Sequence, residues 1–154
     1  MHIGKIINNI DKKYSYQKFN GINFNSKKCK KGDIFFAIKG NKANGNIYIK
    51  DAINRGAKII ISDQKFQGYK DDVLFIKNKN PRKLLSEFCC KIYEAKPANL
   101  VAVTGTNGKS SIANFFFQIL KNNNIKVASI GTLGISTNKS NIKINNTTLD
   151  PITL

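Results

Sequence analysis

A short glycine-rich segment, VAVTGTNGKSS (101–111), carries the residues best suited to chemistry in this chain. Gly105 and Gly108 allow the backbone to turn sharply and to approach an anion without an intervening side chain. An apolar strand is expected before this turn and a helix after it, so backbone N–H groups and the helix dipole would face the ligand. The pattern predicts a phosphate-binding loop.

Two side chains beside this turn match the needs of a nucleoside triphosphate. Lys109 offers a mobile positive charge for the β- and γ-phosphates, and we assign it the catalytic role. The Ser110 hydroxyl is expected to ligate Mg²⁺. ATP and Mg²⁺ are therefore the expected cofactors, and the predicted ATP-binding residues are Gly105, Thr106, Asn107, Gly108, Lys109, Ser110 and Ser111.

The loop departs from the full eight-residue phosphate-loop pattern, because Val103 stands at the position of its first glycine. The alternative interpretation is a plain glycine turn capped by Ser110 and Ser111, with Lys109 in solvent. An apolar strand before the turn and an amphipathic helix after it are the context that a phosphate loop requires. That context favours nucleotide binding.

The elements expected around the loop form a βαβ unit with a right-handed crossover. A strand is predicted over 100–105, a helix over 110–123 and a second strand over 126–134. The apolar stripe of the helix contains Ile112, Phe115, Phe116, Ile119 and Leu120. No later element closes a core, so 98–154 is interpreted as the beginning of an ATP-binding domain, incomplete in this chain.

The preceding residues predict a separate small domain, 1–97, with a break at Pro97. Its expected strands are 32–40, 57–62 and 72–77, and its expected helices are 47–55 and 81–95. The strand over 57–62 is apolar without alternation, as parallel sheets require. The predicted fold class is therefore α/β: a small N-terminal mixed α/β domain followed by the start of a P-loop, Rossmann-like parallel-sheet ATP-binding domain.

Composition narrows the functional classes. The net charge of +17 comes almost entirely from lysines that are scattered along the chain, which argues against a nucleic-acid interface and favours attraction of small anions such as nucleotides. No apolar run is long enough to cross a membrane, and the N-terminal residues lack a secretory signal, so a cytoplasmic protein is expected. Cys29, Cys89 and Cys90 suggest neither disulfides nor a metal site.

Four segments resemble the Mur ligases. TGTNGKSS (104–111) is similar to that family's ATP loop, TGTNGKTT or TGTNGKTS. FNSKKCKKGDIFFAIKGNKANG (24–45) resembles SDSRxVxxGDLFVAxxGxxxDG, and IYIKDAINRGAKIII (47–61) resembles FIxxAIxxGAxAVV. NNTTLDPITL (145–154) is similar to NTTPxPLxL. The matches follow the family's order and fit best the MurE branch, which adds a diamino acid to UDP-N-acetylmuramoyl-L-alanyl-D-glutamate.

The resemblance implies substrate-binding roles that the residues alone do not establish. It places the uridine nucleotide on Phe24, Ser26, Asn41, Lys42 and Ala43, and the muramoyl peptide on Asn146, Thr147 and Thr148. Without it, a helix cap at Ser26 and a turn over 145–148 are the favoured interpretations. Four family positions differ here and bring substrate binding into question: Asn25, Lys27, Asn44 and Leu149.

The resemblance also implies a reaction in peptidoglycan precursor synthesis. ATP phosphorylates the D-glutamate carboxylate of the UDP-linked substrate, and the amine of a diamino acid attacks the acyl phosphate. Mur ligases have three domains, so these 154 residues are expected to have no turnover alone. The alternatives are another Mur ligase or a folylpolyglutamate synthase, a non-catalytic nucleotide or nucleic-acid binding module, and a truncated product without function.

Overall fold

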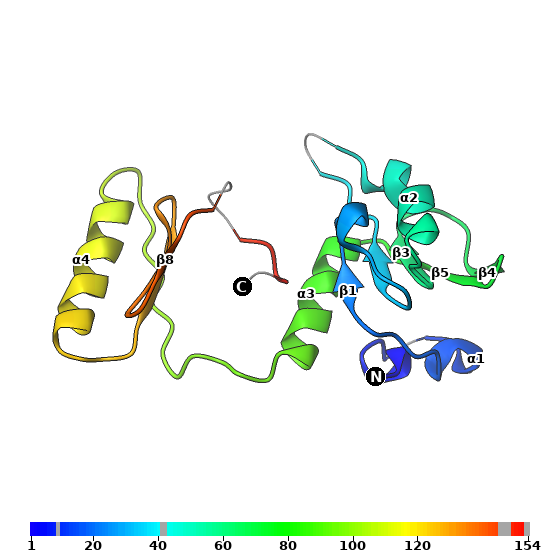
Figure 1. The fold of residues 1–154 in the computed structure, drawn as a ribbon, viewed down its shortest axis with the longest axis horizontal. Helices are drawn as coiled ribbons and strands as arrows, with labels where there is room; N and C mark the ends of the chain where they lie inside the picture. The colour runs from blue at the N-terminus through cyan, green and yellow to red at the C-terminus, as the bar shows by residue number, and fades with distance from the viewer. Residues whose placement is uncertain (9, 41–42, 145–148, 153–154) are drawn as a thin grey trace. The chain divides into compact units, whose positions relative to one another are not determined.

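The computed structural model describes residues 1–154 except 9, 41–42, 145–148 and 153–154. The chain divides into two compact units, Met1–Glu94 and Ala95–Leu154 (Figure 1). Among the described residues, no helix has the length and apolar composition needed to cross a bilayer.

The first unit is built on a five-stranded sheet with the strand order β1-β2-β3-β5-β4. Strands β1, β2, β3 and β5 run parallel, and β4 pairs antiparallel with β5. The α/β fold class is confirmed, as are the strands and helices expected in this unit. In chain order its elements are η1 (Ile3–Lys5), α1 (Lys12–Ser15), β1 (Ile22–Asn23), η2 (Ser26–Lys28), β2 (Ile34–Phe36), η3 (Gly45–Tyr48), α2 (Ile49–Asn54), β3 (Ile59–Ser62), β4 (Gly68–Lys70), β5 (Val73–Lys77) and α3 (Pro81–Ile92).

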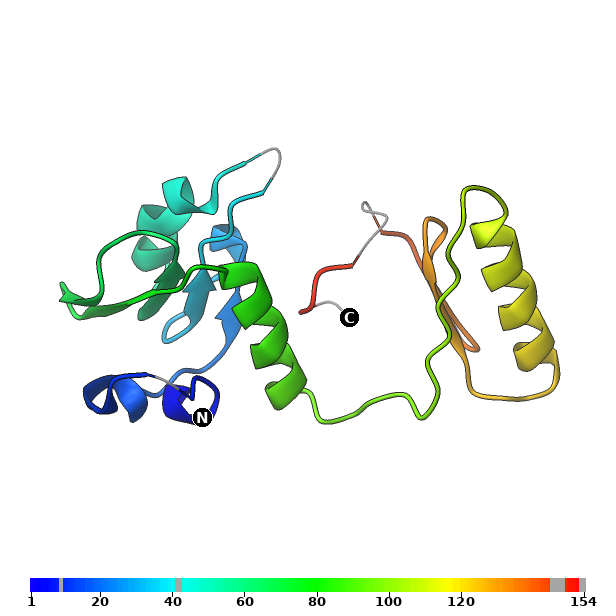
Figure 2. The ribbon, with the colours of Figure 1, turned by 180° about the vertical axis from the view of Figure 1, so that it is seen from behind.

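The central strands are buried on both faces, which explains their unbroken apolar sequences. On one face, Phe35 and Ile60 are paired in register and belong to the same core cluster as Ala52 of α2. On the other face, Phe36 meets Phe88 of α3 with ring centroids 5.2 Å apart. Helices α2 and α3 therefore cover opposite faces of the sheet (Figure 2).

Short polar side chains cap four of the helical segments of this unit. Asp11, Asn25 and Asn44 each accept a hydrogen bond from the backbone N–H two residues later, at the starts of α1, η2 and η3. Asn80 caps α3 by accepting from the Lys83 N–H at 3.0 Å. These caps satisfy N–H groups that a helix leaves unpaired at its N-terminus, so the positions of the helices are fixed locally by sequence.

The second unit consists of one helix and a small antiparallel sheet. It contains α4 (Lys109–Asn122), β6 (Ala128–Gly131), β7 (Gly134–Thr137) and β8 (Asn141–Ile142), with the strand order β6-β7-β8. Helix α4 packs against β6, and Phe117 is its buried residue. The predicted helix is confirmed, whereas the predicted strands around it require correction.

Neither strand expected beside α4 forms as predicted. Residues 100–105 contain no strand, because they find no strand partner in the described part of the chain, and Leu100 is 87% exposed. Residues 126–134, expected as one strand, contain β6 and a tight turn into β7, since Gly131 pairs with Gly134 across a two-residue loop. The described residues of this unit therefore contain an antiparallel hairpin in place of the expected parallel βαβ unit.

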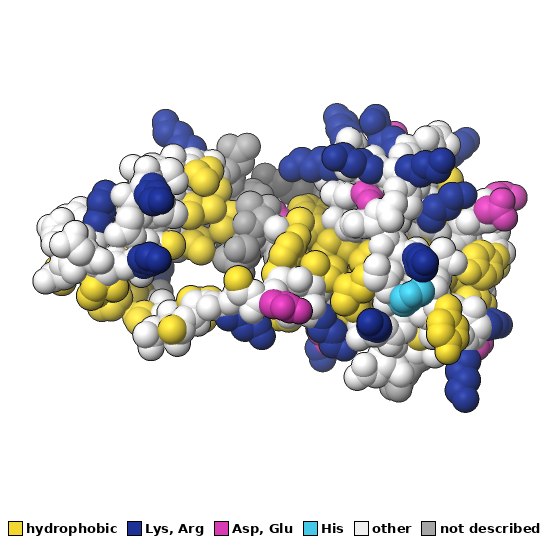
Figure 3. Space-filling model, turned by 60° about the horizontal axis from the view of Figure 1, so that its bottom comes forward, with side chains coloured by type: hydrophobic (Ala, Val, Ile, Leu, Met, Phe, Trp, Pro, Cys, Tyr) yellow, Lys and Arg dark blue, Asp and Glu magenta, His cyan; other side chains and the backbone are white. Residues whose placement is uncertain are grey.

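The expected apolar stripe of α4 does not form a buried face. Ile112, Phe115 and Ile119 are 56%, 62% and 60% exposed, while Phe117 is 6% exposed. The stripe was predicted to pack on a parallel sheet, but the small hairpin covers only the side of α4 that carries Phe117. Hydrophobic side chains consequently reach the surface of this unit (Figure 3).

We expect Phe88→Ala to destabilise the first unit by about 3–5 kcal/mol, because truncation of a fully buried aromatic residue leaves a cavity against Phe36 and Phe19. Urea unfolding of the whole chain measures the change. Glu87→Ala, at an exposed position of the same helix, is the matched control and should change stability by less than about 0.5 kcal/mol. Equal unfolding midpoints for the two variants would contradict the packing described above.

Candidate functional site

The glycine-rich loop enters α4 through a left-handed residue. Gly108 is the N-cap of α4 and has a φ of +75°, a conformation that side chains disfavour. A Cβ atom built on Gly108 would meet no atom within 4 Å, so the space in front of the loop is open. The loop thus has the backbone turn and the clear approach that the sequence predicted for phosphate binding.

The N-terminus of α4 has no side-chain cap, in contrast to the Asx-capped segments of the first unit. Its first turn also contains no acidic residue. The leading N–H groups of a helix have no intrahelical acceptors, and the helix dipole places partial positive charge there. The arrangement leaves donors and positive potential available to an anion.

The Lys109 side chain folds back over the loop. Its Nζ donates to the carbonyl oxygens of Gly105 at 2.5 Å and of Thr106 at 3.2 Å. These acceptors are neutral, and phosphate oxygens form stronger charge-assisted hydrogen bonds with an ammonium group. Lys109 is therefore held beside the open space by contacts that a triphosphate can replace.

Ser110 makes one contact that the sequence did not predict. Its Oγ lies 2.9 Å from the Oγ1 of Thr132, in the turn between β6 and β7. Thr132 was missed because GTLG (131–134) was interpreted as part of one strand. The glycines at both ends of a two-residue segment were the available signal for a hairpin turn.

The donor set suits Mg²⁺ bound together with a nucleotide. Mg²⁺ prefers oxygen ligands, keeps several waters and commonly takes one or two protein ligands in addition to phosphate oxygens. Ser110 supplies a hydroxyl oxygen next to the uncapped helix end. No cluster of three His, Cys, Asp or Glu residues suited to a metal occurs in the described part of the chain, so the fit rests on Ser110 and the phosphates.

Three of the predicted substrate-binding residues lie where parallel strands of the first unit end. Phe24 and Ser26 follow β1, and Ala43 lies in the segment after β2. Ligands of open α/β sheets bind outside the carboxyl ends of the parallel strands. Phe24 is 39% exposed and Ser26 is 5% exposed, so the ring is accessible whereas the hydroxyl is enclosed.

Ser26 contributes to the electrostatics of α2. A hydrogen bond from its hydroxyl is the largest cause that lowers the pKa of the Asp51 carboxyl, and Arg55 acts in the same direction. Arg55 Nε also lies 3.1 Å from Asp51 Oδ1. The cap expected as an alternative role of Ser26 belongs to Asn25 instead, whose side chain accepts from the Lys27 N–H at 3.0 Å.

A backbone hydrogen bond joins the two ends of the segment that follows β2. Gly45 N–H donates to the Ile38 carbonyl at 2.9 Å, and a Cβ at Gly45 would lie 2.5 Å from the Ile38 nitrogen, so only glycine fits. Asn44, which replaces the family's Asp, still accepts from the Asn46 N–H at 3.1 Å. Asn46 then donates to Asp63, after β3, at 2.7 Å. The replacement at Asn44 therefore preserves the local structure.

The remaining substrate-binding predictions fall outside the described residues. These are Asn41 and Lys42 in the first unit, and Asn146, Thr147 and Thr148 in the second. Their roles stay predictions.

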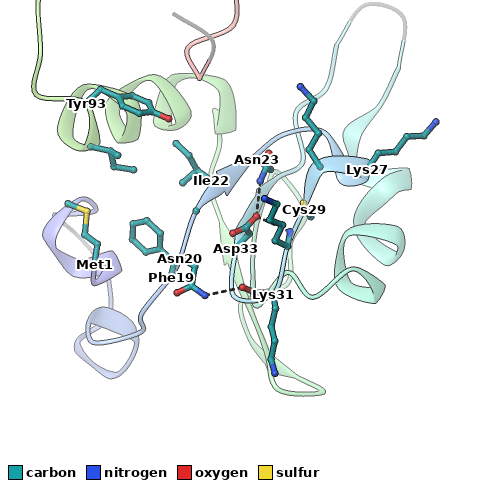
Figure 4. A pocket seen from close by; sticks show the side chains of 14 residues that line it. Met1, Phe19, Asn20, Ile22, Asn23, Lys27, Cys29, Lys31, Asp33 and Tyr93 are labelled. Carbon is teal, nitrogen blue, oxygen red and sulfur yellow. Dashed lines mark hydrogen bonds between the residues drawn. The ribbon is translucent and has the colours of Figure 1, made fainter.

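A cavity of about 980 Å³ lies beside β1 in the first unit. Phe19, Ile22 and Tyr93 contribute apolar walls, and the Asn23 side chain donates to Asp33 Oδ2 at 2.8 Å. Figure 4 shows the side chains of Lys27 and Lys31, which also line the cavity, extending in different directions. Of the described substrate-binding predictions, Phe24, Ser26 and Ala43, none lines this cavity.

Comparison with known proteins identifies the family. The sequence model described as Mur ligase family, catalytic domain, matches residues 18–93. The UDP-N-acetylmuramoyl-L-alanyl-D-glutamate--2,6-diaminopimelate ligase of Rickettsia montanensis is 42% identical over 127 residues, 82% of this chain and 26% of that protein. The enzyme of the same name from Bradyrhizobium diazoefficiens is 40% identical over 134 residues, 87% of this chain and 27% of that protein. This chain belongs to the Mur ligase family.

Solved Mur ligase structures share the fold. A UDP-N-acetylmuramoyl-L-alanyl-D-glutamate--2,6-diaminopimelate ligase matches 99% of this chain with 31% of its own, at a TM-score of 0.76 and 24% identity. The MurF ligase of Thermotoga maritima, solved in complex with ADP, matches 66% of this chain with 23% of its own, at a TM-score of 0.51 and 27% identity. This chain spans about a quarter of the length of the curated Mur ligases it matches.

We expect Ser26→Ala to raise the pKa of Asp51 toward the ordinary carboxyl value, because the largest lowering contact is removed. A carboxyl whose pKa is lowered by folding stabilises the fold above its unfolded-state pKa and loses that contribution as the pH falls through the folded-state value. The variant should therefore lack this contribution above the unfolded-state pKa, and its stability should fall less steeply than that of the unsubstituted chain as the pH falls through the acid range. NMR titration of the Asp51 carboxyl measures the shift.

Ser86→Ala is the control for this titration, since the Ser86 hydroxyl donates to the Arg82 carbonyl on α3. The pKa of Asp51 should be the same in that variant as in the unsubstituted chain. An Asp51 titration unchanged by Ser26→Ala would refute the assigned hydrogen bond.

Proposed function

We propose that this chain provides the nucleotide-binding and substrate-binding part of an ATP-dependent ligase of peptidoglycan precursor synthesis. The ligase joins 2,6-diaminopimelate to UDP-N-acetylmuramoyl-L-alanyl-D-glutamate. The observation that carries the proposal is the open, uncapped N-terminus of α4 with the Lys109 ammonium group beside it. The names of the Rickettsia and Bradyrhizobium relatives support the substrate and the diamino acid, and the ADP in the Thermotoga MurF structure supports the nucleotide.

The chemistry explains why such a ligase uses ATP. A carboxylate resists attack by an amine because oxide would have to leave. Transfer of the γ-phosphoryl group of ATP to a carboxylate oxygen releases ADP and converts that oxygen into part of a good leaving group. The amine of the diamino acid then attacks the carbonyl carbon, the amide bond forms, phosphate leaves and the amine loses a proton.

The residues of this chain act by positioning and by neutralising charge. The N–H groups at the start of α4 bind phosphate oxygens, and Gly108 gives them an unobstructed approach. Lys109 exchanges its contacts with the loop carbonyls for contacts with the β- and γ-phosphates. Mg²⁺, which Ser110 would help to hold, supplies further neutralisation of the triphosphate charge when bound.

We assign recognition of the UDP-linked substrate to residues of both units. Phe24, Ser26, Asn41, Lys42 and Ala43 would hold the uridine nucleotide, and Asn146, Thr147 and Thr148 the muramoyl peptide. The position of Phe24 and Ala43 after the ends of parallel strands supports the first assignment. We extend the proposal to a cytoplasmic location, since ATP is available there.

Binding measurements separate this proposal from a nucleic-acid module. The ligase proposal requires saturable binding of UDP-N-acetylmuramoyl-L-alanyl-D-glutamate, weakened by Phe24→Ala. A nucleic-acid module would bind random DNA with affinity that falls steeply as salt rises. Lys and Arg side chains occur on both units rather than on one alone, which supports the ligase (Figure 3).

We expect Lys109→Ala to weaken binding of MgATP by at least about tenfold, because a charge-assisted hydrogen bond contributes roughly 1.5–3 kcal/mol. Isothermal titration calorimetry of the whole chain measures the affinity. Lys126→Ala removes an exposed lysine beyond the C-terminal end of the same helix and should leave the affinity within about twofold. Equal losses in both variants would show that general positive charge, rather than the loop, attracts the nucleotide.

A further inference from the structure

The hydroxyl groups of Ser110 and Thr132 form a side-chain contact at the loop that the proposed function does not use. They lie 2.9 Å apart and join the first turn of α4 to the turn between β6 and β7. Either oxygen can donate the proton in the nucleotide-free protein. The inference drawn from this pair rests on the proposed function, because it concerns the same nucleotide site.

The position of Thr132 is fixed by the hairpin that carries it. Gly131 and Gly134 are paired across the turn, and Gly134 has a φ of +103°. A Cβ at Gly134 would overlap the carbonyl oxygen of Ile142 in β8, so only glycine allows β8 to pack this closely. The third strand therefore holds the turn in the conformation that brings Thr132 to Ser110.

We propose that Thr132 is a positioning residue of the nucleotide site, whose hydroxyl accepts the Ser110 proton and so directs a Ser110 lone pair to the Mg²⁺ of bound MgATP. A serine hydroxyl has one proton and two lone pairs. It can ligate a cation only when its proton points elsewhere, and an acceptor at 2.9 Å provides that direction. Hydrogen bonds from residues that do not themselves bind a metal commonly orient the groups that do.

A positioning role for Thr132 and a purely structural role for its contact with Ser110 predict different effects on nucleotide affinity. A structural link would stabilise the second unit and leave the contribution of Mg²⁺ to nucleotide affinity untouched. A positioning residue changes the affinity for MgATP and leaves the affinity for metal-free ATP unchanged, because metal-free ATP uses the loop N–H groups and Lys109 but not a Ser110 lone pair. The ratio of the two dissociation constants therefore distinguishes the roles.

The experiment measures ATP binding to the whole chain by calorimetry, once with excess Mg²⁺ and once with EDTA. We expect Thr132→Val to reduce the Mg²⁺-dependent gain in affinity by about 10- to 100-fold, the usual effect of losing an outer contact at a metal site. Thr132→Ser retains the hydroxyl and should restore the gain. Leu133→Ala alters the exposed neighbour in the same turn, and the gain should be unaffected.

A second comparison keeps the test independent of changes in stability. In a chain that carries Ser110→Ala, adding Thr132→Val should have no further effect on the Mg²⁺-dependent gain, because the two residues act through one ligand. Thr132→Ala replaces Thr132→Val if melting curves show that the valine variant does not fold.

The outcomes separate this inference from the proposed function. Loss of affinity that is equal in Mg²⁺ and in EDTA, or an unchanged gain in Thr132→Val, overturns the role of Thr132 while the nucleotide site stands. A wild-type chain that binds no MgATP overturns the proposed function, and the role of Thr132 with it.

Discussion

The proposed nucleotide site depends on the way the backbone enters α4. Gly108 takes a left-handed conformation, so the helix begins without a side chain over its leading N–H groups. Any other residue would pay for this conformation with steric strain and would place a Cβ toward the open space. Lys109 adds its charge at the same point, and Ser110 adds a hydroxyl. The donors, the charge and the metal ligand of the proposed site therefore come from consecutive residues whose arrangement follows from one backbone conformation.

The first unit relies on a different constraint, the burial of a parallel sheet on both faces. Phe35 and Phe36 point to opposite faces of β2, and α2 and α3 must cover both. This packing sets the common direction of β1, β2 and β3, and the segments that follow these strands converge at one edge. The link from Asn46 to Asp63 joins two of those segments. We propose that the uridine nucleotide of the substrate binds at this edge, whereas the ATP site is proposed in the second unit.

Local signals in the sequence predicted much of this structure. The unbroken apolar strand over 57–62 indicated a buried parallel sheet, and Pro81 marked the start of α3. The glycine turn into α4 was predictable because all the residues that form it lie within a short segment, and its binding of ATP stays a prediction. The roles assigned to Asn41, Lys42 and 146–148 are not tested by the described residues and stay predictions.

The errors occurred where formation of an element depends on a distant partner. The apolar residues 100–105 need a neighbouring strand that the described residues do not provide, and Ile112 and Phe115 need a sheet to cover them. Thr132 could not be predicted because its contact with Ser110 depends on the hairpin turn.

Backbone amide NMR shifts of the whole chain, titrated with Mg²⁺ and a non-hydrolysable ATP analogue, test the central claim most directly. We predict that the amides of Gly108, Lys109 and Ser110 shift the most and follow one saturable binding curve, because their N–H groups bind the phosphates. Saturable binding with unmoved amides at these three positions, or with the largest shifts in the lysine-rich residues 27–31 of the first unit, would contradict it.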